Sequence, residues 1–239
     1  DEGYWAECVG RGGFGGTIIH PQHWPEDLDY QGKKIVVIGS GPTAVTLIPA
    51  LANSGAGHVT MLQRSPTYIG ALPHVDPFTV QTNKMLPTKM AYVLNRWKSI
   101  LFQSAQYRIS RRFPNFMRKQ LKTMAQRRLP QGYDVDKHFR PRDNPWDERL
   151  CLAPNGDLFK TIRKGKADAV TDTIERFTKT GIKLTSGAEL EADIIVTATG
   201  LNLQLFGGAE IFRNGVPVDL HNTMAYKGMM LTGLPNMAF

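Results

Sequence analysis

The sequence predicts an α/β fold in which a doubly wound parallel sheet is followed by a β-meander and interrupted by a block of helices. Three observations support this prediction. An apolar run at 35–38 precedes glycines and a helical pattern, residues 85–128 repeat apolar side chains at helical spacing, and short alternating apolar runs occupy residues 169–197. With 239 residues, 41% of them hydrophobic, the chain can bury a core.

The first part of the sheet is predicted from residues 32–64, which form one β-α-β pattern. A strand is expected over 35–38, a helix over 44–53 and a second strand over 59–63. Pro66 ends this pattern, because proline has no N–H for a central ladder. Strands joined through a helix lie parallel, so this unit begins a doubly wound sheet.

The inserted block is expected to contain two or three helices within 85–128, broken near Pro114 and Pro130. It is strongly basic, since no Asp or Glu occurs from Pro77 to Tyr133. Helical spacing predicts that most aromatic side chains of the block are core residues. These aromatics are Tyr92, Trp97, Phe102, Tyr107 and Phe113.

The last part of the fold follows a loop rich in Pro, Asp and Asn at 141–147 and a helix expected near 157–164. Alternating apolar residues then predict short strands joined by tight turns. These strands are expected at 169–172, 174–177, 182–185 and 194–197. They read as a β-meander that returns to a parallel strand.

The turn between the first strand and its helix has the pattern G-x-G-x-x-A. Its residues are Gly39, Ser40, Gly41, Pro42, Thr43 and Ala44. The first glycine permits a tight turn, the second lets a pyrophosphate approach the backbone, and the alanine lets helix and strand pack closely. A glycine turn that serves packing alone is the alternative, and the strand–turn–helix context favours a Rossmann-type dinucleotide site.

The end of the second strand predicts which dinucleotide binds. An NAD site places an acidic residue there for the ribose 2′-hydroxyl, whereas this chain has Gln63, Arg64 and Ser65. A cation and a hydroxyl suit a 2′-phosphate, so NADPH is the expected cofactor. The alternative interpretation of Arg64 is a solvated surface arginine.

A further motif, F-x-G-x-x-x-H-x-x-x-W-P, precedes the glycine turn. Its residues are Phe14, Gly16, His20, Trp24 and Pro25. Taken singly, His20 and Trp24 would be a loop histidine and a core aromatic. Together the residues resemble the fingerprint of Baeyer–Villiger-type flavin-containing monooxygenases, which links the FAD and NADP domains of that family. Further segments look like the subgroup that oxidises thioamides and activates ethionamide: 20–28, 63–68, 144–147 and 198–202.

The resemblance implies an NADPH- and FAD-dependent monooxygenase that uses O₂. Through a C4a-peroxyflavin, such an enzyme inserts one oxygen into a ketone or oxidises the sulfur of a thioether or thioamide. Arg149 aligns with the arginine that holds this peroxide as an anion, a role that suits a guanidinium because it keeps its charge. Ala198, Thr199 and Gly200 look like the cofactor-binding strand end from which the family returns to its FAD domain.

The domain assignment follows from the resemblance. The expected parts are a fingerprint linker at 1–30, an NADP-binding domain at 31–75 and 165–205, a helical insertion with an active-site loop at 76–164, and a partial return toward the FAD domain at 206–239. No second strand is followed by a glycine fingerprint, so the FAD domain is expected to be mostly missing and FAD binding is assigned to the intact enzyme. An NADP(H)-binding fragment without activity is the alternative.

Charge and cysteine content bear on partners and location. The formal net charge of +8 suits nucleic acid, an anionic lipid surface or a phosphorylated cofactor. We expect no nucleic-acid partner, and a peripheral membrane contact through the basic helical block. Cys8 and Cys151 predict neither a disulfide framework nor a metal site, so a cytoplasmic location is expected. Both ends of the chain read as cuts in a longer protein.

Overall fold

The structure is a computed structural model that describes residues 2–4, 9–148, 150–202 and 204–239. Its chain divides into two compact units. One unit is Gly3–Gly200, and the other consists of Leu201–Phe239 together with the first two residues. The larger unit contains every site residue predicted from the sequence, so it is described first.

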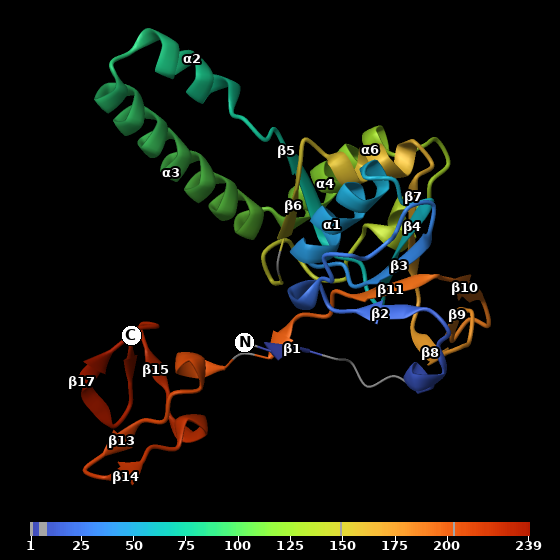
Figure 1. The fold of residues 1–239 in the computed structure, drawn as a ribbon. Coiled ribbons are helices and arrows are strands. Elements are labelled where there is room, and N and C mark those ends of the chain that lie inside the picture. Colours follow the sequence, from blue (N-terminus) through green and yellow to red (C-terminus); the bar gives the residue numbers. More distant parts are fainter. Residues whose placement is uncertain (1, 5–8, 149, 203) are drawn as a thin grey trace. The chain divides into compact units, whose positions relative to one another are not determined.

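The larger unit is built on a five-stranded parallel sheet in the order β2-β11-β3-β4-β7 (Figure 1). Its strands are β2 (Thr17–Ile19), β3 (Lys34–Ile38), β4 (His58–Gln63), β7 (Ala167–Thr171) and β11 (Ile194–Thr197). Val36 of β3 lies opposite Thr60 of β4 and Ile195 of β11. The strand order reverses on either side of β3, as in a doubly wound fold, and the predicted fold class is confirmed.

Both faces of the sheet are covered, and the buried residues of β3 on both faces are apolar. Ile35 and Val37 face one core, which they share with α1 (Pro42–Asn53) and α6 (Asp157–Arg163). Val36 faces the other core, against a small antiparallel sheet. The strands of this small sheet are β8 (Ile174–Phe177), β9 (Gly181–Leu184) and β10 (Glu189–Glu191). The unbroken apolar run is typical of a parallel strand buried on both faces.

One part of the predicted meander is wrong. The strand expected at 169–172 is β7, which pairs in parallel with β4 and places Ala169 opposite Met61. Ala167 and Ala169 are buried in the core shared with α6, while Val170 packs against the other core. β7 is therefore the edge strand of the five-stranded parallel sheet, with both of its faces covered. The meander is β8-β9-β10, and its third strand is too polar to be recognised by alternation.

The helical block lies between the two strands of a parallel pair that the sequence did not predict, β5 (Tyr68–Leu72) and β6 (Leu150–Pro154). The helices are α2 (Pro77–Met85), α3 (Thr88–Arg112), α4 (Pro114–Arg128) and α5 (Val135–His138). The predicted break at Pro114 is confirmed. The helix α2 was not predicted; its N-cap Asp76 accepts a hydrogen bond from the Phe78 N–H at 3.2 Å, and Pro77 occupies its first position.

The prediction that the aromatic residues of this block lie in the core is wrong. Tyr92, Trp97, Phe102, Tyr107 and Phe113 are between 49% and 61% exposed. The buried residues of α3 are the small Ala91 and Ser110, so the helix packs through a narrow face of small and polar side chains. Periodicity showed which residues share a face, but not which face is covered.

The smaller unit consists of short strands and turns. The bounds are β12 (Leu201–Asn202), β13 (Phe212–Arg213), β14 (Val216–Pro217), β15 (Ala225–Tyr226), β16 (Met230–Leu231) and β17 (Leu234–Ala238). β13 pairs with β14, and β15-β16-β17 form an antiparallel sheet. The remaining elements of the chain are β1 (Glu2–Gly3) and the 3-10 helices Arg11–Gly13, Pro21–His23, Leu205–Gly208 and Leu220–Asn222. Among the described residues, no helix is long and apolar enough to cross a membrane.

Candidate functional site

The turn between β3 and α1 requires glycine at its first position. Gly39 has a φ of +133°, and its N–H donates to the carbonyl oxygen of Leu62 at 2.8 Å. A Cβ at this residue would lie 2.4 Å from the carbonyl oxygen of Ala198. The backbone conformation and the close approach of β11 both exclude a side chain here.

The N-terminus of α1 is open for an anion. Its N-cap is Gly41, and no side chain caps the first turn. Pro42 occupies the first helical position, and Ala44 is fully buried against the sheet. Because the first N–H groups of a helix have no partner inside it, this end can bind phosphate oxygens, although Pro42 supplies no donor.

Ser40 ties the glycine turn to the loop that follows β4. Its Oγ lies 2.8 Å from the Thr67 Oγ1 and donates to the Ser65 carbonyl oxygen at 3.4 Å. Thr43 in the first turn of α1 and Arg64 directly after β4 are exposed. The turn and the end of β4 therefore hold each other in place.

Gln63, at the end of β4, connects α5 and β7 through side-chain hydrogen bonds. Its side chain is 2% exposed, and its Nε2 donates to the His138 carbonyl oxygen at 2.7 Å and to the Thr171 Oγ1 at 2.8 Å. The Oε1 atom is buried and has no hydrogen-bond partner among the described residues. The Gln63 amide thus fixes α5 and the end of β7 beside the end of β4. The Nδ1 of His138 lies 2.9 Å from the Thr171 Oγ1, and burial lowers the pKa of this imidazole.

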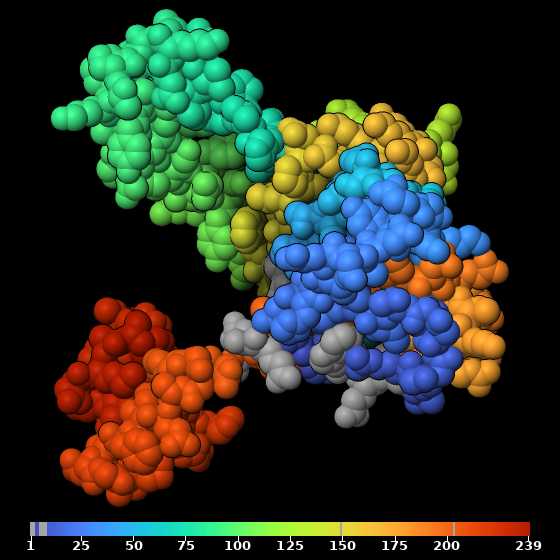
Figure 2. Space-filling view, viewed as in Figure 1, coloured from blue at the N-terminus to red at the C-terminus, as the bar shows by residue number. Residues whose placement is uncertain are grey.

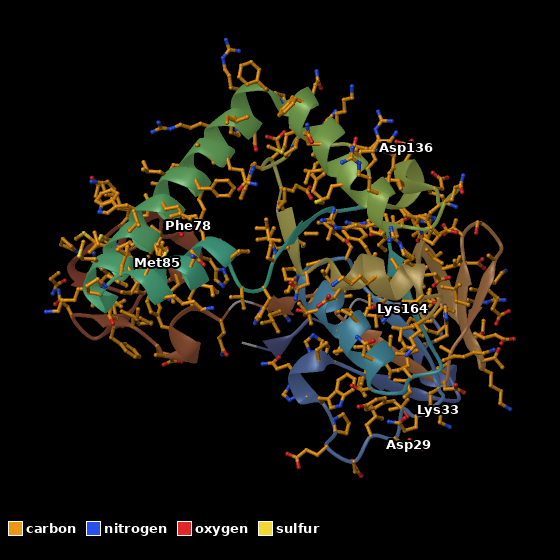
Figure 3. The ribbon with its side chains drawn as sticks, turned by 90° about the horizontal axis from the view of Figure 1, so that it is seen from above. Asp29, Lys33, Phe78, Met85, Asp136 and Lys164 are labelled. Carbon is orange, nitrogen blue, oxygen red and sulfur yellow. The ribbon has the colours of Figure 1, made fainter. Side chains whose placement is uncertain are left out.

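A cavity of about 500 Å³ lies beside the end of β4. Its lining includes Arg64, Ser65 and Pro66 after β4, Thr171 of β7, and the cations Lys137, Arg140 and Arg142, together with the carboxylates Asp136, Asp143 and Glu148. Within the described part of the chain, Arg64 and Lys137 make no ion pair. Asp136 is already paired with Lys122 at 2.6 Å and Arg140 at 3.2 Å, which lowers its pKa (Figure 3).

Sequence reasoning missed the cations of α5 and its following loop. His138 is 75 residues from Gln63, and no local pattern distinguishes Lys137 from the other cations of a basic region. Only the hydrogen bond between Gln63 and His138 places α5 at this edge of the sheet.

The predicted fingerprint residues form internal contacts. His20 is 4% exposed; its Nδ1 accepts from the Gln22 N–H at 3.2 Å, so its Nε2 donates to the Gly200 carbonyl oxygen at 3.1 Å. A Cβ at Gly16 would lie 2.7 Å from the Phe14 ring and 2.2 Å from the Asp193 carbonyl oxygen. The histidine and the glycine thus connect the β2 region to both ends of β11.

The last two fingerprint residues and the residues after β11 each make contacts of their own. Trp24 packs edge-on against Tyr30 with ring centroids 6.4 Å apart, and the Pro25 carbonyl oxygen accepts from the Leu28 N–H at 3.4 Å. After β11, the Thr199 Oγ1 donates to the Tyr4 carbonyl oxygen at 2.6 Å. The Gly200 carbonyl oxygen accepts from the Tyr4 N–H at 3.0 Å.

The structure brings the glycine turn and the β4 end together, and it places the end of β11 against the turn through the Ala198 carbonyl oxygen. The fingerprint contacts the loop after β11 through His20 and Gly200. Arg149, the predicted catalytic residue, lies outside the described residues. In the described ranges, no cluster of His, Cys, Asp or Glu could hold a metal ion.

Comparison with known proteins shows what the chain is similar to. No family model matches the chain. The chain is 73% identical over 238 residues to the FAD-containing monooxygenase EthA of Mycolicibacterium smegmatis, a match that covers 100% of this chain and 48% of that protein. It is 64% identical to EthA of Mycobacterium tuberculosis, with 100% of this chain and 49% of that protein covered. Over its whole length the chain is thus similar to FAD-containing monooxygenases.

The resemblance predicted from the fingerprint is confirmed by these relatives, and the chain spans about half of their length. Solved structures share its fold. An open structure of cyclohexanone monooxygenase matches with a TM-score of 0.66 at 19% identity, covering 91% of this chain and 50% of that one. An oxidised steroid monooxygenase bound to NADP matches with a TM-score of 0.64 at 21% identity, covering 84% of this chain and 44% of that one.

Proposed function

We propose that the intact protein is an NADPH- and FAD-dependent monooxygenase that inserts one oxygen of O₂ into ketones or oxidises sulfur in thioethers or thioamides. The observation that carries the NADPH assignment is the glycine turn of β3 and α1 beside a cavity lined by cations at the end of β4. Relatives described as FAD-containing monooxygenases support the reaction class. FAD and O₂ supply the oxygenating chemistry when bound.

The pyrophosphate of NADPH is assigned to the turn from Gly39 to Ala44. The residue Gly39 can carry no Cβ without meeting the Ala198 carbonyl oxygen, and the first turn of α1 has no side-chain cap. A phosphate at this end would accept from free N–H groups and lie at the positive end of the helix dipole. Ser40 would keep the turn in register with the loop after β4.

The 2′-phosphate of NADPH is assigned to the cavity at the end of β4. Arg64 and Lys137 lie on this cavity without an ion pair to any described residue, so each can turn toward a phosphate. Ser65 adds a hydroxyl donor. Gln63 acts as a positioning residue, because its amide holds the α5 backbone beside Arg64. A charge-assisted hydrogen bond to phosphate contributes about 1.5–3 kcal/mol.

Arg149 is proposed to stabilise negative charge on the reacting oxygen. A guanidinium suits this role because it stays charged at every relevant pH and does not give up its proton. In Arg149→Ala, NADPH should still reduce the flavin of the holoenzyme, while oxygenated product is lost and hydrogen peroxide accumulates. Stopped-flow absorbance with a product assay on a simple ketone or thioether separates the two steps, and a normal product yield would remove Arg149 from the mechanism.

An NADP(H)-binding protein without oxygenase activity is the second candidate, favoured by the presence of only one glycine fingerprint after a strand in this sequence. The absorbance spectrum of the purified intact protein distinguishes the two candidates, since bound flavin has a visible band.

The cofactor assignment is tested by titration with NADPH and NADH. We expect Arg64→Ala and Lys137→Ala each to weaken NADPH binding by roughly 10- to 100-fold and to leave NADH binding nearly unchanged. Lys164→Ala is the control, because Lys164 is an exposed lysine beyond α6 that does not line the cavity. An unchanged NADPH to NADH ratio in both cavity variants would refute the assignment.

A further inference from the structure

The helix α3 has an apolar face that is exposed among the described residues of the larger unit. The residues of this outer face follow helical spacing over three turns and are each 41–64% exposed: Met90, Val93, Leu94, Trp97, Ile100 and Leu101. Residues spaced by three, four and seven positions lie on one side of a helix. An ordinary surface helix turns such a face inward, and α3 turns it outward.

The side of α3 next to this face is the one that packs. Ala91 is fully buried, the Asn95 side chain hydrogen-bonds to Thr82 of α2 at 2.9 Å, and Lys98 pairs with the α2 N-cap Asp76. These contacts fix α2 and α3 as a hairpin. Figures 1 and 3 show that its connecting turn, next to Met85, lies at the end of the hairpin away from the parallel sheet. Figure 2 shows the hairpin as a separate lobe.

The charge around the outer face has one sign. No acidic residue occurs from Pro77 to Tyr133. Lys89 and Arg96 flank the apolar residues, and Arg108 and Arg112 follow the face at the C-terminal part of α3. Asp76, the nearest carboxylate along the chain, is paired with Lys98. Exposed apolar side chains flanked by Lys and Arg are complementary to a partner that has an apolar interior and an anionic surface.

We propose that the α2–α3 hairpin docks on anionic membrane surfaces. The outer face enters the boundary between lipid headgroups and acyl chains, and the flanking cations contact anionic headgroups. Trp97 lies in the middle of the face, and the amphipathic indole favours this boundary. An exposed contiguous apolar patch marks an interaction site, and this one lies on a projecting helix rather than in a groove. The basic region predicted a surface contact, and the outer face gives it an apolar component.

The first test is sedimentation of the protein with phosphatidylcholine vesicles, with and without phosphatidylglycerol. We expect binding to the anionic vesicles that weakens with salt. The triple substitution Met90→Ser, Trp97→Ser and Leu101→Ser should weaken it by at least roughly tenfold. The matched control is the triple substitution Phe212→Ser, Val216→Ser and Met224→Ser on the smaller unit, because those side chains are 56–73% exposed and the three on α3 are 58–64% exposed. The control should bind like the unmodified protein.

The contribution of the cations and the insertion of Trp97 into the bilayer are tested separately. Arg96→Gln and Arg108→Gln should each weaken binding about fivefold, whereas Lys164→Gln should not. Brominated lipid should quench the tryptophan fluorescence of bound protein, and Trp97→Phe should remove that quenching.

Absence of salt-sensitive binding, or binding that survives the triple substitution on α3, would overturn the proposal. A dimer that this triple substitution dissociates, without any vesicle binding, would assign the outer face to a second copy and would also overturn it.

Discussion

Gly39→Ala is the substitution for which the structure gives the most definite expectation. An alanine at a φ of +133° is disfavoured by about 1–3 kcal/mol, and its Cβ would lie 2.4 Å from the Ala198 carbonyl oxygen. Relieving that overlap by shifting β3 or β11 costs about 1–3 kcal/mol more. We therefore expect a loss of about 2–6 kcal/mol in the free energy of unfolding and, at this size, a fall of roughly 2–4 °C in melting temperature per kcal/mol.

Gly187→Ala is the matched control. Gly187 also has a positive φ, +89°, but a Cβ there meets nothing within 4 Å, so only the backbone term of about 1–2 kcal/mol applies. Thermal unfolding followed by circular dichroism compares the two variants, and NADPH titration shows whether the turn still binds pyrophosphate. Equal melting temperatures for the two variants would refute the argument from close approach, and unchanged NADPH affinity of Gly39→Ala would refute the assignment of the turn.

Three further expectations concern single side chains. His20→Ala removes one of the two donors of the Gly200 carbonyl oxygen, which keeps the Tyr4 N–H, and should lower the free energy of unfolding by about 0.5–1.5 kcal/mol in urea denaturation; no change would show that water replaces the imidazole. The pKa of His138 is lowered by burial and then by the charge of Lys137, so the unfolded state binds a proton more readily than the folded state. The free energy of unfolding should therefore fall as pH drops below about 6.5. His138→Gln should reduce that fall. The pKa of Asp76 is lowered to about 2, chiefly by its hydrogen bond with Lys98, so its contribution should be lost as pH falls from 3.8 toward 2, and Asp76→Asn should remove that part of the acid transition.

The sequence predicted best where a pattern is local. Strands expected at 35–38 and 59–63 and a helix expected at 44–53 correspond to β3, β4 and α1 within two residues at each end. Each has an uninterrupted apolar run or helical spacing, and each ends at glycine or proline. The fingerprint pattern was also found, because its spacing is fixed over twelve neighbouring positions.

Features that depend on distant partners were missed. β2 is a strand of three residues that is ordered by pairing with β11, and β5 is paired only with β6. Lys137 reaches the candidate cofactor cavity because the Gln63 amide bonds the backbone of His138. None of these has a local signal, since each depends on which residues become neighbours after folding.

The position of β11 between β2 and β3 sets the order in which the nascent chain can fold. β3, α1 and β4 are neighbours in sequence and can associate as soon as they leave the ribosome. β2 cannot join them, because its only partner in the sheet is β11, and its contact through Ile19 and Thr197 closes a separation of 178 residues. At roughly 5–20 residues per second, β2 stays unpaired on the order of 10–40 s during synthesis. The fingerprint segment is thus synthesised among the first parts of the larger unit but pairs with the sheet late. During that interval it can be bound by chaperones that recognise extended apolar strands.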